Sequence, residues 1–76
     1  MLKTQTIEID KNGNIYLNSK PTSLVSLSDL IKPLDKDMPI LIRADRDIAL
    51  QVFVDVLDAV KTLGFKRVSL QTEARR

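Results

Sequence analysis

The chain has 76 residues, of which 43% are hydrophobic and 29% charged, the proportions of one small folded domain. Cysteine and histidine are absent, which excludes disulfide frameworks, thiol nucleophiles, Ser-His-Asp triads and zinc sites built on sulfur or imidazole. The 12 basic and 10 acidic residues leave a net charge of +2 and are interspersed, as on a solvated surface rather than a nucleic-acid-binding stripe. No apolar run approaches the ~18 residues that cross a bilayer. These features favour an adaptor or interaction domain over an enzyme, with no cofactor.

The first part of the chain has the pattern of a β-hairpin. Residues 4–10 alternate isoleucine with polar side chains, and residues 15–17 repeat the alternation. Between them lies Asn12-Gly13, a dipeptide that accepts the positive φ angles of a hairpin turn. Two antiparallel strands are therefore expected, followed by a turn at residues 18–21.

A short helix is expected next. Ser26 opens a Ser-x-x-Asp segment that resembles a capping box, and Val25 and Leu30 are placed to form the accompanying hydrophobic pair. Pro33 disfavours helical geometry at the preceding residue and lacks the amide that the helix ladder needs. The helix should therefore cover about residues 27–31.

The second half predicts a strand, a long helix and another strand. Residues 39–42 are continuously apolar, which is typical of a central strand covered on both faces. Beyond this strand the apolar period becomes helical, with Asp45 or Asp47 as the expected N-terminal cap and Gly64 as the expected stop. Residues 68–70 alternate again, as in a last strand.

These elements predict a single domain over residues 1–76 with the order ββαβαβ. The long helix connects two strands as a right-handed βαβ crossover, so those strands should be parallel, whereas the opening hairpin is antiparallel. The expected fold is therefore α+β, a two-layer α/β sandwich with a mixed sheet and two helices on one face.

Four segments resemble the periplasmic domain of the ExbD/TolR family. Residues 7–18 are similar to the family's opening hairpin, Asp-x-x-Gly-x-Ile-x-Leu-Asn, and residues 42–45 read Ile-Arg-Ala-Asp, like its strand ending in Ala-Asp. Residues 56–58 read Val-Leu-Asp where the family has Val-Met-Asp, and residues 63–70 resemble its Ala-Gly turn into the last strand. The resemblance covers roughly residues 6–72, and the order and spacing of the segments give it specificity.

The resemblance implies a non-enzymatic domain of an inner-membrane energy-transducing complex. Family members have a cytoplasmic tail, one transmembrane helix with a proton-carrying carboxylate, and this periplasmic domain. This chain contains nothing that corresponds to that helix. With an ExbB/TolQ-type partner they form a proton-driven motor that acts on TonB (ExbD-like) or TolA (TolR-like). The resemblance therefore implies a homodimer in the periplasm, tethered to the inner membrane, with the ExbD-like assignment preferred and peptidoglycan as a further contact for a TolR-like domain.

Arg43 and Asp45 are candidate partner contacts because they lie where a strand enters a helix, a place where α/β proteins build sites. The simpler interpretation is a strand-to-helix turn in which Asp45 bonds backbone amides. Arg43 with Asn12 or Asn14 could also be imagined in a small enzyme of the acylphosphatase type, but the chain has only two glycines and no glycine-rich phosphate cradle.

Four residues of the long helix are further candidate contacts with a partner or a second copy. Leu50, Val54 and Leu57 widen its apolar stripe, which either a second copy or the first helix would cover. Asp58 lies on the polar face and either contacts the motor partner or pairs with Lys61.

Two further possibilities concern the sheet. The opening hairpin and the last strand are candidate edges, where a TonB or TolA peptide could add as a strand or two copies could exchange strands. A freestanding α/β interaction or nucleic-acid-binding module is the alternative from another class. It would need stacking aromatics on the sheet, and of the three aromatic residues only Tyr16 lies firmly on a predicted strand.

Overall fold

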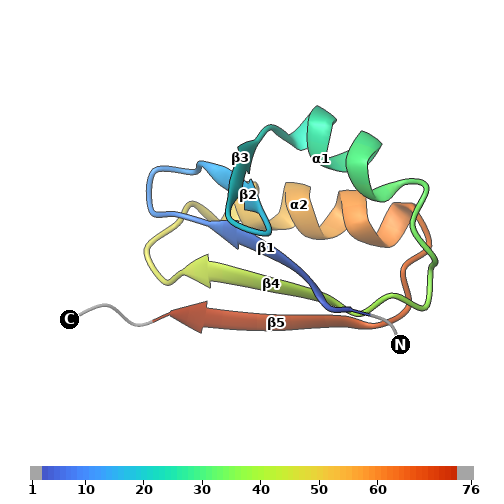
Figure 1. Ribbon diagram of the computed structural model, residues 1–76. Coiled ribbons are helices and arrows are strands. Elements are labelled where there is room, and N and C mark those ends of the chain that lie inside the picture. The colour runs from blue at the N-terminus through green and yellow to red at the C-terminus, as the bar shows by residue number, and fades with distance from the viewer. Residues whose placement is uncertain (1–2, 74–76) are drawn as a thin grey trace.

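Residues 3–73, which the computed structural model describes, form a five-stranded sheet with two helices packed on one face (Figure 1). The elements in chain order are β1 (Gln5–Ile9), β2 (Ile15–Leu17), β3 (Lys20–Thr22), α1 (Leu24–Ile31), β4 (Ile40–Asp45), α2 (Leu50–Thr62) and β5 (Val68–Glu73). The expected α+β, two-layer sandwich is confirmed.

The sheet has the strand order β3-β2-β1-β4-β5. β1, β4 and β5 are parallel, and β2 pairs antiparallel with both β1 and β3. The predicted hairpin is confirmed, and so is the predicted parallel pairing of β4 and β5, which α2 connects. Because β1 and β4 are parallel neighbours, their carboxyl ends meet at one end of the sheet.

The third strand was not expected from the sequence, so the observed order is βββαβαβ. Asn18 and Ser19 adopt positive φ angles of 50° and 73°, and they turn β2 directly into β3. The side-chain oxygen of Asn18 accepts a hydrogen bond from the Thr6 amide at 3.0 Å, which ties this turn to β1. The strand contains Pro21, which a sheet tolerates because β3 lies at its edge.

Helix α1 begins one turn earlier than predicted. The Ser23 hydroxyl, rather than Ser26, is the N-terminal cap and accepts a hydrogen bond from the Ser26 amide at 3.2 Å. The expected packing of Val25 against Leu30 is wrong, because both side chains are exposed. The end of the helix before Pro33 is confirmed.

Helix α2 lacks the side-chain cap that the sequence indicated. Its N-terminal cap position is Ala49, with no side-chain hydrogen bond, so the prediction of Asp45 or Asp47 is wrong. Its predicted end is confirmed, since Gly64 has a φ of +95°, the left-handed conformation that follows many helices.

The core lies between the sheet and the two helices. It consists of alternate residues of β1 and β4, one face of each helix, and single residues from β2 and the loop after α2, namely Ile7, Ile9, Ile15, Leu27, Ile31, Ile40, Ile42, Ala44, Val56, Val60 and Phe65. The alternating residues between them, such as Glu8, Leu41 and Arg43, belong to the other sheet face. No helix of the described chain covers that face, and Leu41 is only half-buried, so the expectation that residues 39–42 are covered on both faces is wrong.

Candidate functional site

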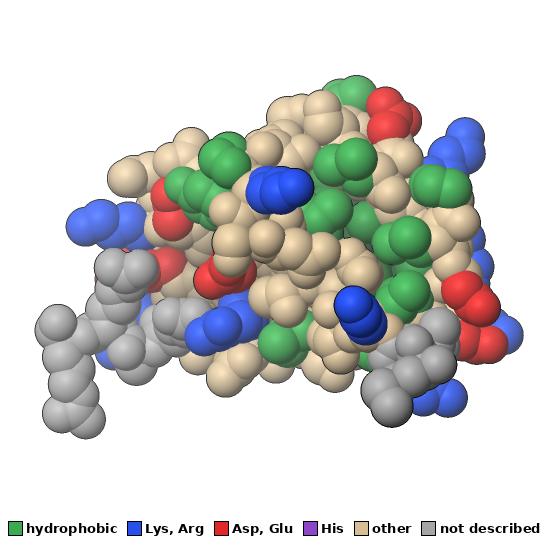
Figure 2. Space-filling model, in the orientation of Figure 1, with side chains coloured by type: hydrophobic (Ala, Val, Ile, Leu, Met, Phe, Trp, Pro, Cys, Tyr) green, Lys and Arg blue, Asp and Glu red, His purple; other side chains and the backbone are tan. Residues whose placement is uncertain are grey.

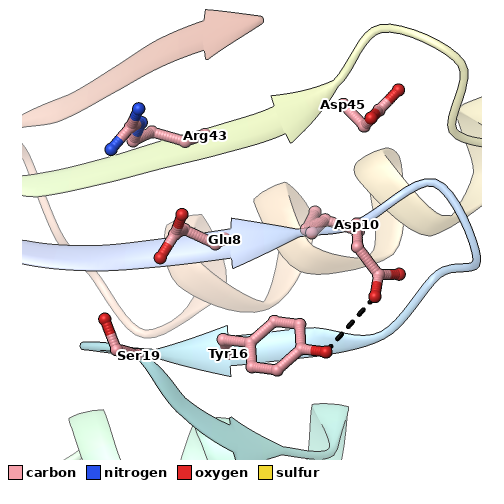
Figure 3. Close-up of a pocket in the computed structure, with 7 residues that line it drawn as sticks. Glu8, Asp10, Tyr16, Ser19, Arg43 and Asp45 are labelled. Atoms are coloured by element: carbon pink, nitrogen blue, oxygen red, sulfur yellow. Dashed lines mark hydrogen bonds between the residues drawn. The ribbon is translucent and has the colours of Figure 1, made fainter. Parts of the chain in front are cut away.

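The uncovered sheet face carries a row of mostly polar side chains. The strand registers place one residue from each strand of the described sheet side by side, in the order Pro21, Tyr16, Glu8, Arg43 and Gln71. Figure 3 shows this face with the helices behind it. Its central positions are therefore an aromatic ring, a carboxylate and a guanidinium.

A pocket of about 360 Å³ opens on this face and extends from Ser19 toward the carboxyl ends of β1 and β4 (Figure 3). It is lined by Glu8, Ile9, Asp10, Tyr16, Ser19, Arg43 and Asp45. The lining includes three acidic residues and one basic residue, although the whole chain has a net charge of +2. Elsewhere the charges are mixed, and Figure 2 shows acidic and basic side chains scattered over the face it presents. The pocket is therefore locally acidic on a weakly basic domain.

Asp10 organises the rim of this pocket. One carboxylate oxygen accepts hydrogen bonds from the backbone amides of Asn12 and Asn14, at 3.0 and 2.9 Å. The other accepts from the Asn14 side-chain amide at 3.0 Å and the Tyr16 hydroxyl at 3.2 Å. The side chain of Asn14, considered above as a partner of Arg43 in an enzyme, is thus bound to Asp10.

These bonds shift two pKa values. The side-chain and backbone hydrogen bonds from Asn14, which have the largest effects, hold the pKa of Asp10 below its ordinary value. The negative charge of Asp10 raises the pKa of Tyr16, because it opposes ionisation of the phenol. At neutral pH the rim therefore contains an aspartate anion bound to a neutral tyrosine.

Asp10→Asn is expected to make the free energy of unfolding depend less on pH between neutral and acidic conditions. Because the folded-state pKa of Asp10 is depressed, its ionised form contributes stability above the ordinary aspartate pKa, and this is lost as pH falls through the folded-state pKa. The check is urea unfolding of both proteins between about pH 6 and about pH 2. The difference between their midpoints should shrink toward low pH, and a difference independent of pH would contradict the prediction.

Glu8 lies at the centre of the uncovered face, between Tyr16 and Arg43 in the sheet register. Its side chain is half-buried and lines the pocket. Within residues 3–73 no hydrogen bond or ion pair engages its carboxylate, not even with the neighbouring Arg43. Glu8 is thus a carboxylate that faces the pocket without a protein partner in the described chain.

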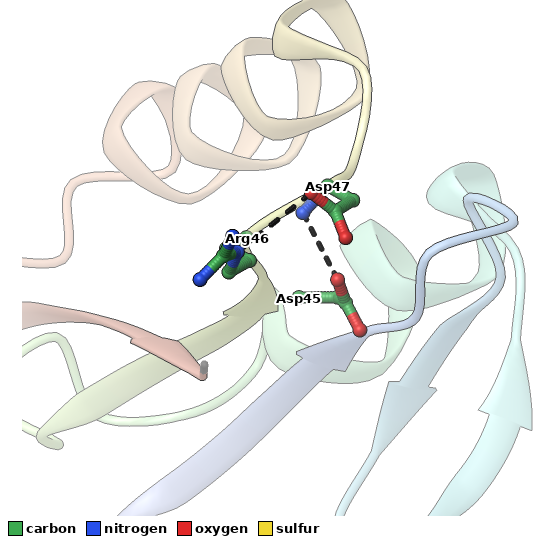
Figure 4. A network of polar contacts seen from close by, with 3 residues as sticks. All are labelled: Asp45, Arg46 and Asp47. Carbon is green, nitrogen blue, oxygen red and sulfur yellow. Dashed lines mark hydrogen bonds and ion pairs between the residues drawn. The ribbon is translucent and has the colours of Figure 1, made fainter. Parts of the chain in front are cut away.

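Asp45 ends β4 at the edge of the pocket and is only 8% exposed. Its carboxylate accepts a hydrogen bond from the Asp47 amide at 2.9 Å, so the expected bonding to a backbone amide is present, but in the turn before α2 rather than at the helix cap (Figure 4). The Arg46 Nε lies 3.8 Å from the Asp47 Oδ1 in an exposed ion pair, which contributes little to stability. Asp45 therefore shapes the turn that connects the pocket to α2.

The candidate residues of α2 lie on the other side of the sheet from the pocket. Leu50 is 75% exposed and Val54 43% exposed, whereas Leu57 is half-buried and packs against the core. Asp58 is exposed, and no ion pair joins it to Lys61 in the described structure. The six candidates therefore form two groups, Arg43 and Asp45 on the sheet face and the others on α2.

Sequence reasoning did not identify Glu8, Asp10, Tyr16 or Ser19 as site residues. The first three occupy polar positions in the alternation of residues 4–17, and that alternation is the signal that could have placed Glu8 and Tyr16 on one face. Within residues 3–73 there is no group of three or more side chains that could hold a metal ion. Among the described helices none has the length and hydropathy of a bilayer span.

Comparison with known proteins gives a consistent result. The model of the family described as "Biopolymer transport protein ExbD/TolR" matches residues 2–75. The Biopolymer transport protein ExbD of Aquifex aeolicus (strain VF5) is 41% identical over 64 residues, which are 84% of this chain and 48% of that protein. The protein of the same name from Helicobacter pylori (strain J99) is 29% identical over 73 residues, or 96% of this chain and 57% of that protein. The chain thus spans about half the length of these relatives.

Proposed function

Because this chain belongs to the ExbD/TolR family of biopolymer transport proteins, we propose that it is the periplasmic domain of a proton-driven, energy-transducing complex of the inner membrane. The observation that carries the proposal is the family match over residues 2–75, which includes the sheet and both helices. The role is binding rather than catalysis, since family and relatives are described as transport proteins.

The proposed partners follow from the family. In the full-length protein a transmembrane helix tethers the domain to the inner membrane beside an ExbB/TolQ-type protein. The domain then contacts TonB, which spans the periplasm, or TolA if the protein is TolR-like. The names of the relatives favour ExbD and hence TonB.

The edge strand β5 is the place where an extended segment of the partner could bind to the sheet. This strand is the last in the sheet order, so its outer side presents backbone groups to which an extended peptide can add. The opposite edge, β3, has only three residues and includes Pro21, which removes one backbone donor. An added partner strand is therefore better accommodated at β5 than at β3.

The proposal is tested by titrating the ¹⁵N-labelled domain with peptides from the periplasmic parts of TonB and TolA of the same organism. A TonB peptide should shift amide signals of β5 and slow hydrogen exchange of its outward amides, whereas scrambled peptides should not. Stronger binding of the TolA peptide would reassign the domain as TolR-like. Spectra unchanged by either peptide would contradict the proposal.

Homodimerisation is proposed to involve the exposed apolar residues of α2. Leu50→Lys should weaken self-association at least about tenfold, because burial of a leucine side chain contributes about 1.5–3 kcal/mol. Gln51→Lys is the matched control, since this neighbouring side chain is exposed and receives the same charge. Sedimentation velocity over a concentration series measures both variants. Equal association of both with the wild type would place the dimer interface elsewhere.

A further inference from the structure

We propose that the pocket on the uncovered sheet face binds a basic side chain from an extended segment of a partner protein. Glu8 pairs with the cation, and the ring of Tyr16 forms the adjacent wall. The proposal rests on the proposed function only in taking the occupant to be a segment of a partner protein. It concerns a different surface from the β5 edge and the exposed side of α2.

Glu8 is a half-buried carboxylate in the middle of the sheet. The residue belongs to β1, the middle strand of the sheet, where neighbouring strands on both sides reduce its access to water. A half-buried carboxylate loses part of its hydration, and its binding free energy for a charged donor is correspondingly larger than at an exposed position. Within residues 3–73 no donor contacts its oxygens. A cation that enters the pocket therefore meets an acceptor that the described chain does not use.

Tyr16 lies opposite Glu8 on the neighbouring strand. Its register partner across the antiparallel pair is Glu8, and side chains at such positions have Cβ atoms about 4.5–5.5 Å apart. The hydrogen bond from the Tyr16 hydroxyl to Asp10 holds the ring in place. Figure 3 shows the Glu8 carboxylate directed toward the Ser19 side and the Tyr16 ring directed toward Asp10, so a lysine or arginine side chain can pair its charged end with Glu8 while its aliphatic part packs beside the ring.

The charge and size of the pocket also fit a basic side chain. Among the described residues that line the pocket, three of the four charged ones are acidic, which complements a cation. Its volume of about 360 Å³ lies at the lower end of the range of about 300–1,000 Å³ for ligand sites, enough for one or two side chains. A second sheet stacked on this face would remove the charged Glu8 and Arg43 from water, which is costly for charges. These properties favour a single segment of a partner over a sheet-on-sheet dimer.

The experiment uses the ¹⁵N-labelled chain and the synthetic peptide acetyl-Thr-Thr-Lys-Thr-Thr-amide. Matched peptides carry norleucine or glutamate in place of the lysine. The lysine peptide should shift the amide signals of Glu8, Tyr16 and Ser19, and its affinity should exceed that of the norleucine peptide at least about fivefold, the effect of about 1 kcal/mol. The glutamate peptide should not bind.

The contribution of Glu8 is isolated with Glu8→Gln, which keeps the shape of the side chain and should remove the preference for lysine over norleucine. Asp58→Asn is the control for lost charge on a remote surface and should retain that preference. Equal binding of the lysine and norleucine peptides to the wild type, or shifts confined to α2 or β5, would overturn the proposal, and neither measurement requires a variant to fold. Loss of self-association in Glu8→Gln would also overturn it, by assigning the pocket to a second copy. Because no TonB or TolA sequence is used, failure here leaves the proposed function to its own test.

Discussion

Val56→Asp is expected to abolish the folded domain. Val56 lies on the inner face of α2, is 1% exposed and belongs to the core between the sheet and the helices. An unpaired carboxylate there costs several kcal/mol even after its pKa rises, because no donor surrounds it. A stability of about 0.05–0.15 kcal/mol per residue gives about 4–11 kcal/mol for this chain, so the substitution removes most or all of it. Far-ultraviolet circular dichroism and amide signal dispersion should show loss of cooperative folding.

Val54→Asp is the matched control, two residues earlier on the same helix. Its side chain is 43% exposed, so in the monomer the same new charge stays in contact with water and should change the unfolding free energy, measured on dilute protein, by no more than about 0.5 kcal/mol. The comparison removes the effects of helix propensity and net charge, which both variants share. If Val54→Asp unfolds the domain while Val56→Asp does not, α2 packs on the sheet through a different face from the one described.

The elements predicted correctly share strong, regular patterns. The hairpin of β1 and β2 has alternation around a turn dipeptide, and α2 has a helical apolar period over several turns with Gly64 at its end. The third strand was missed because its three residues are too few for a visible period and include Pro21, which normally argues against a strand. The start of α1 was misplaced because Ser23 and Ser26 are equally good caps in sequence. Leu24 packs against the core and belongs to the helix that begins after Ser23, whereas a helix that began after Ser26 would not include it.

The site shows a sharper limit of sequence reasoning. Arg43 and Asp45 were found because a strand end before a helix is a local signal. Glu8 and Tyr16 become a pair only through the register of the hairpin, and Arg43 joins them only because β1 and β4 are parallel neighbours. The sequence predicted β4 and β5 to be parallel but contained no signal for which strand lies on the other side of β4. A pocket formed across three strands therefore depends on a pairing that only the folded structure shows.

Leu27→Ala is expected to destabilise the domain by about 2–5 kcal/mol, the range for leucine truncation in a core. Leu27 is 0% exposed and lies with Ile31 on the buried face of α1. A helix of eight residues is not stable by itself in water, so α1 depends on these contacts with the sheet and with α2. The loss should lower the midpoint of thermal unfolding by at least about 8 °C, since 1 kcal/mol corresponds to about 4–8 °C in a domain of this size.

Leu30→Ala is the corresponding control on the same helix. The side chain is 54% exposed, so its truncation removes little buried surface and leaves no closed cavity. Leu30→Ala should lower the free energy of unfolding by less than about 1 kcal/mol. Both variants gain the same intrinsic preference of alanine for a helix. Thermal unfolding of the two proteins, with hydrogen exchange of the α1 amides, separates global destabilisation from local release of the helix. Equal costs at positions 27 and 30 would mean that α1 does not dock through the Leu27 face, and the core beneath it would have to be formed differently.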